Sequence, residues 1–509
     1  MNKSENGNEI KNGITLSYVS LLATVLTNLL YTPVMLRCLG KNEYGVYSIC
    51  NSFITYLGLL NFGLGSSYVR YYTMYKARND EEKIKKLNGL FLKVFIIIGI
   101  IVLLVGGFLD YNISWVLGDK FTGNEIQLAR KLFILMTFNM AVSMPNSVFT
   151  SFISANEKFV FQKLVELIKV IGNPFVTVPL LLLGYRSVAV VMVATVLIVI
   201  QFVSNIVFCI KILNVKFDFK GTDYRLLLEI AGFSFFIFLQ TVMDQINWQL
   251  DKFVLARVVG SASIAVYEVG SLFNTIFVQS STTISSVFTP RIHKLNIENK
   301  YREIDELMGS VGRIQTIVVC LVYTGFLFFG KTFVRVWAGR DYGNAYYIGV
   351  LIMAPLVVTL TQNIAHEICR ARNVHRMRSV LEFGISIINL IISIPLCYKF
   401  DEIGCAIGTF ISMNISVFIV TPLYLKKVAK IDYFYTLKER LKLIPSMVVP
   451  FIVGAIISYL KWNYTIKGFL IFACFYVIIY FVFIYFCGLY EGEKVMLKEY
   501  TRKIFKRKR

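Results

Sequence analysis

The sequence of 509 residues has few charged residues and very few histidines. Only 17% of its residues are charged and 56% are hydrophobic, whereas a soluble domain carries about 25% charged residues. This imbalance excludes an ordinary soluble domain and indicates a membrane protein. Three His residues, and nine Cys without a CxxC pair, form no metal-ligand spacing. We therefore expect no metal site, no cofactor and no disulfide framework, and interpret the cysteines as packing residues.

Segments of alternating apolar and polar residues, typical of membrane β-barrels, are also missing. Instead, apolar runs of about 20 residues, long enough to cross roughly 30 Å of hydrocarbon as a helix, recur along the chain. No cleavable signal peptide is predicted, because the first run is too long and lacks a small-residue cleavage site. We predict an all-α polytopic membrane protein with about 14 transmembrane helices, over residues 14–36, 44–68, 88–109, 131–153, 159–183, 187–210, 226–250, 264–288, 310–330, 345–368, 379–398, 403–424, 445–460 and 468–488.

Positive charge alternates between the segments that join these runs. Of the 53 Lys and Arg residues, 35 belong to every second segment, starting with the amino-terminal tail, and 13 belong to the intervening ones. The positive-inside rule therefore places both termini in the cytoplasm of a bacterial cell (inner or plasma) membrane. Basic residues beside anionic lipid explain the net charge of +22, so nucleic acid is not an expected partner.

One short segment occurs twice, 220 residues apart: "LRCLGKNEYGVY" at 36–47 and "ARVVGSASIAVY" at 256–267. Each copy follows the first helix of a six-helix set, which predicts two parallel repeats that form two lobes, followed by a C-terminal helix pair. We expect an N-terminal lobe at 1–215, a C-terminal lobe at 216–428, additional helices at 429–488 and a basic cytoplasmic tail at 489–509. The identities across the copies pair Arg37, Gly40, Val46 and Tyr47 with Arg257, Gly260, Val266 and Tyr267.

Polar residues recur at helical spacing in the first two helices of each set. The alternatives are a water-accessible cavity between the halves and polar contacts that hold helices together; we favour the cavity for the stripe that contains Asp244. The stripes comprise Gln240, Asp244, Asn247 and Asp251; Ser20, Thr24, Thr27 and Tyr31; Glu268, Ser271, Thr275 and Gln279; and Ser48, Asn51 and Thr55.

Charged residues inside apolar runs are expensive to insert, so each needs a partner or a function. Lys169 lies deep in its run, and the alternatives are an ion pair with Glu166 three residues earlier or contact with an anionic substrate. Lys93, Arg70 and Arg37 lie nearer the ends of runs, where they either guide a phosphate or reach lipid head groups. His366 and Glu367 are further groups able to carry a proton, and Glu382 is expected to pair with an Arg of the basic loop before it.

Two apparent enzyme motifs are rejected. "GFLFFGKT" at 325–332 matches the P-loop pattern but lies at the end of an apolar run, on the predicted outer side. "HEICR" lacks the second His of a zinc protease, and no nucleophile with a paired base is found. We expect no catalytic residues and no enzyme activity.

Three stretches of the sequence carry a resemblance to a known family: "LRCLGKNEYGVY", "LGLLNFGLGSSYVRYY", and "DKFVLARVVGSASIAVY" with its Asp251, Gly260 and Tyr267. The chain resembles the polysaccharide transporter, or O-antigen flippase, branch of the multidrug/oligosaccharidyl-lipid/polysaccharide flippase superfamily. The resemblance implies two lobes in a V and alternating access. It also implies transport of a polyprenyl-diphosphate-linked oligosaccharide to the outer leaflet for surface polysaccharide such as O-antigen or capsule. Coupling to H+ or Na+ is further implied, for which Asp244, Glu268, Asp251 and Glu166 are the carboxylate candidates.

The expected partners are this lipid-linked substrate, membrane lipids and other polysaccharide assembly proteins. The alternatives are a cation-coupled multidrug exporter of the same superfamily and a membrane-embedded acyltransferase or polymerase, for which His366 is the intramembrane His. The predicted substrate-binding residues are Lys169, Glu166, Lys93, Arg70, Arg37, Thr24, Asn51, Gln240 and Asn247. The saccharide, the coupling ion and the oligomeric state are not predicted.

Overall fold

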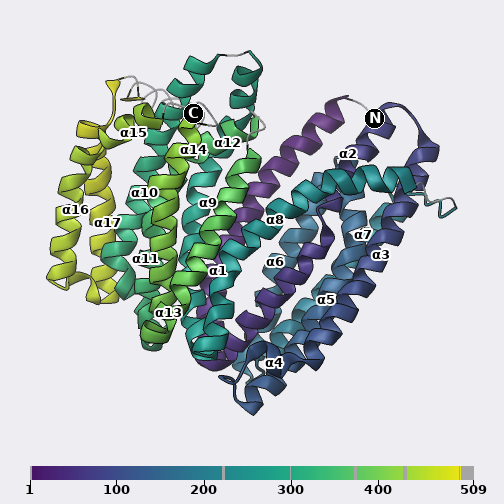
Figure 1. The fold of residues 1–509 in the computed structure, drawn as a ribbon, viewed down its shortest axis with the longest axis horizontal. Coiled ribbons are helices and arrows are strands. Elements are labelled where there is room, and N and C mark those ends of the chain that lie inside the picture. Colours follow the sequence, from purple (N-terminus) through teal and green to yellow (C-terminus); the bar gives the residue numbers. More distant parts are fainter. Residues whose placement is uncertain are drawn as a thin grey trace, which may run out of the picture. The chain divides into compact units, whose positions relative to one another are not determined.

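The computed structural model describes residues 3–220, 224–298, 300–371, 375–427, 433–491 and 493–494, and all the regular structure in them is helical (Figure 1). The predicted all-α fold is confirmed. The α-helices are α1 (Lys3–Leu57), α2 (Leu64–Ala77), α3 (Glu81–Tyr111), α4 (Ile113–Leu117), α5 (Gly123–Ala155), α6 (Phe159–Leu182), α7 (Ser187–Lys211), α8 (Tyr224–Val258), α9 (Ser261–Ile297), α10 (Tyr301–Trp337), α11 (Gly343–Leu360), α12 (Asn363–Ala371), α13 (His375–Ile415), α14 (Thr421–Lys427), α15 (Tyr433–Leu441), α16 (Ile444–Tyr459) and α17 (Ile466–Phe483). Short 3₁₀ segments are η1 (Gly58–Asn61), η2 (Arg340–Tyr342) and η4 (Trp462–Tyr464), and π-helical segments are η3 (Ser416–Val420) and η5 (Ile484–Gly488).

The helices follow the predicted apolar runs closely. Within the described residues, ten helical segments are long and apolar enough to cross a membrane. Two of them, Val19–Ala77 with 59 residues and Val380–Lys427 with 48 residues, are long enough for two crossings. Both are interrupted: α1 breaks at Gly40, whose φ of 74° favours glycine, and α13 breaks at Phe400 and Asp401. The number of fourteen helices stays a prediction.

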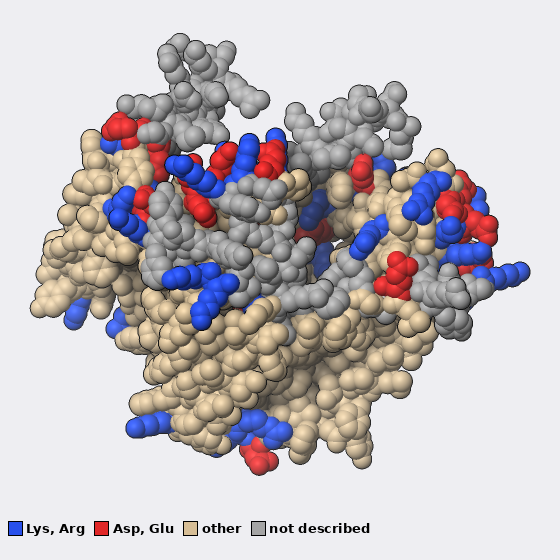
Figure 2. Space-filling model, turned by 45° about the horizontal axis from the view of Figure 1, so that its top comes forward, with Lys and Arg blue, Asp and Glu red and all other residues tan. Residues whose placement is uncertain are grey.

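The surface of the helices is that of a protein in lipid. Figure 2 shows charged side chains gathered toward the top and the bottom of the view, with a broad uncharged surface between them. Large apolar side chains are exposed in the interior of the helices, such as Leu104 at 67%, Ile168 at 65% and Ile391 at 65%. Exposed apolar surface of this extent is unfavourable in water and suits hydrocarbon. The chain is a multi-pass membrane protein.

The chain divides into two compact units, residues 1–266 and 267–509. In the first unit, α3, α5 and α7 pack together and α1 packs along α6. The predicted boundary between lobes, after residue 215, stays a prediction, as do the other predicted domain limits.

The connection between α7 and α8 is attached to α3. The amide of Asp218 donates to the Lys85 carbonyl (3.0 Å), and the Asn88 side chain donates to the Lys216 carbonyl (2.9 Å). Gly89 allows this close approach, because a Cβ added there would lie 1.9 Å from the Asp218 carbonyl oxygen. The connection is therefore held by backbone contacts that a larger side chain would prevent.

Replacing Gly89 with Ala is expected to detach the connection and lower the melting temperature of the detergent-purified protein by several degrees, since a contact shorter than van der Waals distance forces the backbone to move. Thermal unfolding checks this. Gly107→Ala is the matched control on the same helix, where a Cβ meets no atom within 4 Å. Equal melting temperatures for the two variants would contradict the prediction.

In the second unit, α16 and α17 pack against α10. Their shared core includes Phe328, Phe329 and Ile457. Two buried tyrosines of α17 add polar contacts: the Tyr476 hydroxyl donates to Thr324 Oγ1 (2.6 Å), and the Tyr480 hydroxyl donates to the Ile317 carbonyl (2.8 Å). Hydroxyl groups buried in this way need a partner, so these bonds specify how the helix pair docks.

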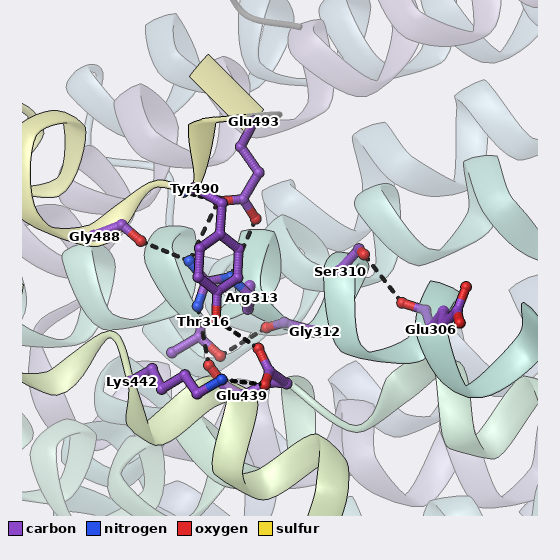
Figure 3. Close-up of polar contacts among 10 residues, drawn as sticks. All are labelled: Glu306, Ser310, Gly312, Arg313, Thr316, Glu439, Lys442, Gly488, Tyr490 and Glu493. Atoms are coloured by element: carbon purple, nitrogen blue, oxygen red, sulfur yellow. Dashed lines mark hydrogen bonds and ion pairs between the residues drawn. The ribbon is translucent and has the colours of Figure 1, made fainter. Parts of the chain in front are cut away.

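Arg313 of α10 joins the segment after α17 to α15 (Figure 3). Its side chain is only 2% exposed and donates to both Glu493 carboxylate oxygens (3.1 and 3.2 Å) and to the Glu439 and Gly488 carbonyls (3.1 and 2.6 Å). The Tyr490 ring lies 3.9 Å from the guanidinium. A buried guanidinium that donates four hydrogen bonds connects three elements that are distant in the sequence.

The Glu439 carboxylate accepts from Tyr490 Oη (2.7 Å) and Lys442 Nζ (2.5 Å). Partial burial opposes its ionisation, but these bonds outweigh it and lower the pKa of Glu439. Its stabilising contribution is thus complete above the ordinary Glu pKa of about 4.3 and is lost as pH falls through the lowered value. We expect the difference in melting temperature between wild type and Glu439→Gln to stay constant from about pH 7 to about pH 5 and to shrink as the pH is lowered further toward about 3. A difference that stays constant down to about pH 3 would contradict this.

Candidate functional site

Lys169 lies in the interior of α6 and contacts a neutral partner. It is half-buried, and its Nζ donates to Gln201 Oε1 on α7 (3.2 Å). The sequence left open whether Lys169 pairs with Glu166 or contacts a substrate. In the structure, the Glu166 carboxylate accepts a hydrogen bond from Lys163 at 2.6 Å, and no direct ion pair joins it to Lys169 among the described residues. Within the described residues Lys169 makes no ion pair with a carboxylate. Its positive charge is therefore held by an amide and remains able to attract an anion.

The other predicted cations lie elsewhere in the first unit. Lys93 donates to the Phe219 carbonyl (2.6 Å), on the connection that docks on α3. Arg70 on α2 and Arg37 on α1, just before the Gly40 break, are both exposed. The structure does not bring these three together with Lys169 through any described contact.

The polar residues of α1 include side chains that hold helices together. Ser52 Oγ donates to Gln249 Oε1 (3.0 Å), and the Tyr56 hydroxyl donates to the Gln245 carbonyl (3.3 Å), so this part of α1 lies beside α8. Thr24 donates to the carbonyl of Ser20 on its own helix (2.8 Å), and Asn51 is exposed. The side chains of Gln240, Asp244 and Asn247 lie outside those that the structure describes.

Helix α9 has two polar faces. The predicted stripe is open: Glu268 and Ser271 are half-buried, whereas Thr275 and Gln279 are exposed. Exposed amide and hydroxyl groups in the interior of an apolar run suit a water-accessible path better than hydrocarbon. Asp251, at the end of α8, is buried with 6% of its surface exposed.

The second polar face of α9 is buried and was not predicted. Ser281 donates to the Leu360 carbonyl where α11 ends (2.8 Å), and Gln315 of α10 donates to Ser285 Oγ (2.6 Å). Asn363, at the start of α12, donates to Ser281 Oγ (3.2 Å). This network satisfies the Leu360 carbonyl, a backbone group that the end of α11 leaves without a partner in its own helix.

Other sequence predictions can be placed directly. Glu382 pairs with Arg378 at 2.6 Å, which confirms the predicted ion pair; Arg378 belongs to the first turns of α13 rather than to a loop. His366 is buried in α12, and Glu367 is half-buried. The P-loop-like residues 325–332 lie inside the continuous helix α10, so they form no phosphate-binding loop.

Two kinds of group in these helices suit a polar, anionic cargo. A cation held by a neutral amide, such as Lys169 on Gln201, can exchange that amide for phosphate oxygens. Exposed hydroxyl and amide side chains, such as Thr275 and Gln279, can exchange hydrogen bonds with sugar hydroxyls. Gln201 was missed in the sequence, although a Gln that interrupts the apolar run 187–210 is the signal that marks it.

The fold is that of membrane transporters. The structure resembles the lipid II flippase MurJ in an inward closed conformation with a TM-score of 0.72, at 18% identity over 92% of this chain and 98% of that one. It also resembles an inward-facing multidrug resistance MATE family transporter with a TM-score of 0.66, at 13% identity over 81% of this chain and 99% of that one.

The chain belongs to the polysaccharide biosynthesis protein family, whose model matches residues 34–346. It is 21% identical over 399 residues to a putative O-antigen transporter of Shigella flexneri, covering 76% of this chain and 91% of that protein. It is 18% identical over 223 residues to a probable low-salt glycan biosynthesis flippase, Agl15, of Haloferax volcanii, covering 44% of each chain. The resemblance inferred from the sequence is confirmed.

Proposed function

We propose that this protein is a flippase that moves a polyprenyl-diphosphate-linked oligosaccharide from the cytoplasmic to the outer leaflet of a bacterial plasma membrane by alternating access. The observation that carries the proposal is Lys169, a half-buried cation inside α6 whose polar partner is the amide of Gln201. A diphosphate has the charge that such a cation binds, and a lipid-linked sugar has the hydroxyl groups that an open polar helix face binds.

The family and its relatives support this cargo. The relatives from Shigella flexneri and Haloferax volcanii are named as an O-antigen transporter and a glycan biosynthesis flippase. These names favour a glycan cargo and transport over catalysis. We further propose that both termini are cytoplasmic, in accord with the alternation of Lys and Arg, and that transport is coupled to H+ or Na+ through Asp244, Glu268 or Asp251.

The test uses purified full-length protein in proteoliposomes with a fluorescent polyprenyl-diphosphate oligosaccharide. The leaflet of the sugar is followed by a membrane-impermeant quencher, with protein-free liposomes as the control. We expect protein-dependent movement of the lipid-linked sugar, faster under an imposed H+ or Na+ gradient. The MATE-like fold makes a cationic dye the appropriate second cargo. Movement of the dye alone would make the protein a multidrug exporter, and movement of neither would reject the proposed cargo.

A further inference from the structure

The two copies of the repeated segment meet in the first unit. Gly45 lies in the first copy, and a Cβ added to it would come within 1.8 Å of the Ser261 carbonyl oxygen in the second. Both copies turn at a glycine with positive φ, Gly40 at 74° and Gly260 at 126°. The two copies, which lie 220 residues apart in the sequence, therefore contact each other through their backbones.

Glu125, in the first turn of α5, ties this contact together. One carboxylate oxygen accepts from Ser261 Oγ (2.5 Å), and the other accepts from the backbone amide and hydroxyl of Thr122 (both 2.8 Å). The side chain of Asn42, in the first copy, adds a further hydrogen bond to the carboxylate. One anion thus receives donors from α5 and from both copies, and charge-assisted bonds of this kind are among the stronger ones in proteins.

The segment 112–122 before α5, which contains the short helix α4, contacts the second copy from another side. The Arg257 guanidinium lies 5.2 Å from the Trp115 ring centre. Gly118 has a φ of 86°, and a Cβ there would lie 3.1 Å from Arg257 Cδ. A Cβ added to Gly260 would likewise lie 3.3 Å from the Lys120 carbonyl oxygen. The segment 112–122 and the Glu125 carboxylate therefore together contact the connection between α8 and α9 and the first residue of α9.

We propose that Glu125 is a latch that keeps the two copies together at the face predicted to lie outside the cell, and that its bond to Ser261 must break before this face opens. The inference rests on the proposed alternating-access function, which requires the outer face to open and close. The latch closes a backbone contact too tight to admit a substrate, so releasing it is a condition of cargo release to the outside.

The test measures opening without any substrate. Ser48, one turn beyond Gly45 and only 4% exposed, is replaced with Cys as a reporter. Intact cells are treated with a membrane-impermeant maleimide, and labelling at position 48 is quantified by peptide mass spectrometry, so that native cysteines do not contribute. We expect slow labelling in the reporter protein and at least about tenfold faster labelling after Ser261→Ala, since one hydrogen bond to a carboxylate is lost.

Three further variants make the result specific. Ser261→Thr keeps a hydroxyl and should restore slow labelling. Thr122→Ala weakens the cap of α5 but leaves the Ser261 bond, so it should change the rate less than Ser261→Ala. Asn124→Ala, at an exposed position beside Glu125, should have no effect. An unchanged rate after Ser261→Ala, or an equal increase after Thr122→Ala, would overturn the latch. Faster labelling in a protein that moves no lipid-linked sugar would instead support the latch and reject the proposed cargo.

Discussion

Replacing Lys169 with Ala is expected to reduce transport of the lipid-linked sugar by roughly 10- to 100-fold, the loss that follows from removing one charged hydrogen-bonding partner of the diphosphate. The protein should insert at least as well as wild type, because a Lys at mid-membrane opposes insertion by about 2.5–3.5 kcal/mol and Ala removes that cost. The measurement is the proteoliposome assay, with protein quantity determined in the membrane fraction.

Lys163 is the matched control for this prediction. It lies on the same helix, but its charge is already paired with Glu166 at 2.6 Å. Lys163→Ala should therefore retain most transport. Gln201→Ala removes the amide that positions Lys169 and should give an intermediate loss. Full transport by Lys169→Ala at a normal protein level would remove Lys169 from the proposed site.

Replacing Arg313 with Ala is expected to destabilise the second unit by about 3–5 kcal/mol, because the change leaves the Glu493 carboxylate without its buried partner and opens the space that the guanidinium fills. The Glu439 and Gly488 carbonyls lose their donors in the same step (Figure 3). Thermal unfolding in detergent gives the loss of stability. Limited proteolysis between α17 and residue 494 should show faster cleavage in the variant.

Arg302 provides the control on the same helix. It is 94% exposed and pairs with Glu306, so Arg302→Ala should change stability by less than about 1 kcal/mol. Arg313→Lys keeps the charge but not the forked geometry, and we expect it to recover only part of the stability. If Arg313→Ala and Arg302→Ala unfold at the same temperature, the Arg313 contacts do not stabilise the helix pair.

The positions of the helices could be predicted from the sequence because lipid imposes a simple rule. A backbone in hydrocarbon must satisfy its own hydrogen bonds, and an apolar run of about 20 residues marks a helix wherever it occurs. The run 159–183, for example, corresponds to α6 at Phe159–Leu182. Interruptions within the runs were harder to predict from the sequence. Phe62 and Gly63, for example, separate η1 from α2 but lie in an apolar stretch whose hydropathy does not indicate a break.

Partners of polar residues could not be predicted in the same way. Glu166 has Lys163 and Lys169 each three residues away, and only the rotation and packing of α6 against α7 decide that Lys163 pairs with it and Lys169 contacts Gln201. Glu382 was easier, since its partner Arg378 lies four residues before it on the same helix. Local pairs are readable from spacing, whereas contacts such as Glu125 with Ser261 cross 136 residues.

Composition and the length of the apolar runs alone determined that this protein is helical and lies in a membrane, because burial in lipid acts on each run independently of the others. The repeated segment is also visible in the sequence. Only the tertiary structure decided that the two copies touch at Gly45 and Ser261, that Glu125 joins them, and that Arg313 fastens the last helices. These contacts depend on which helix faces meet, and helix packing is a property of the whole chain rather than of any segment.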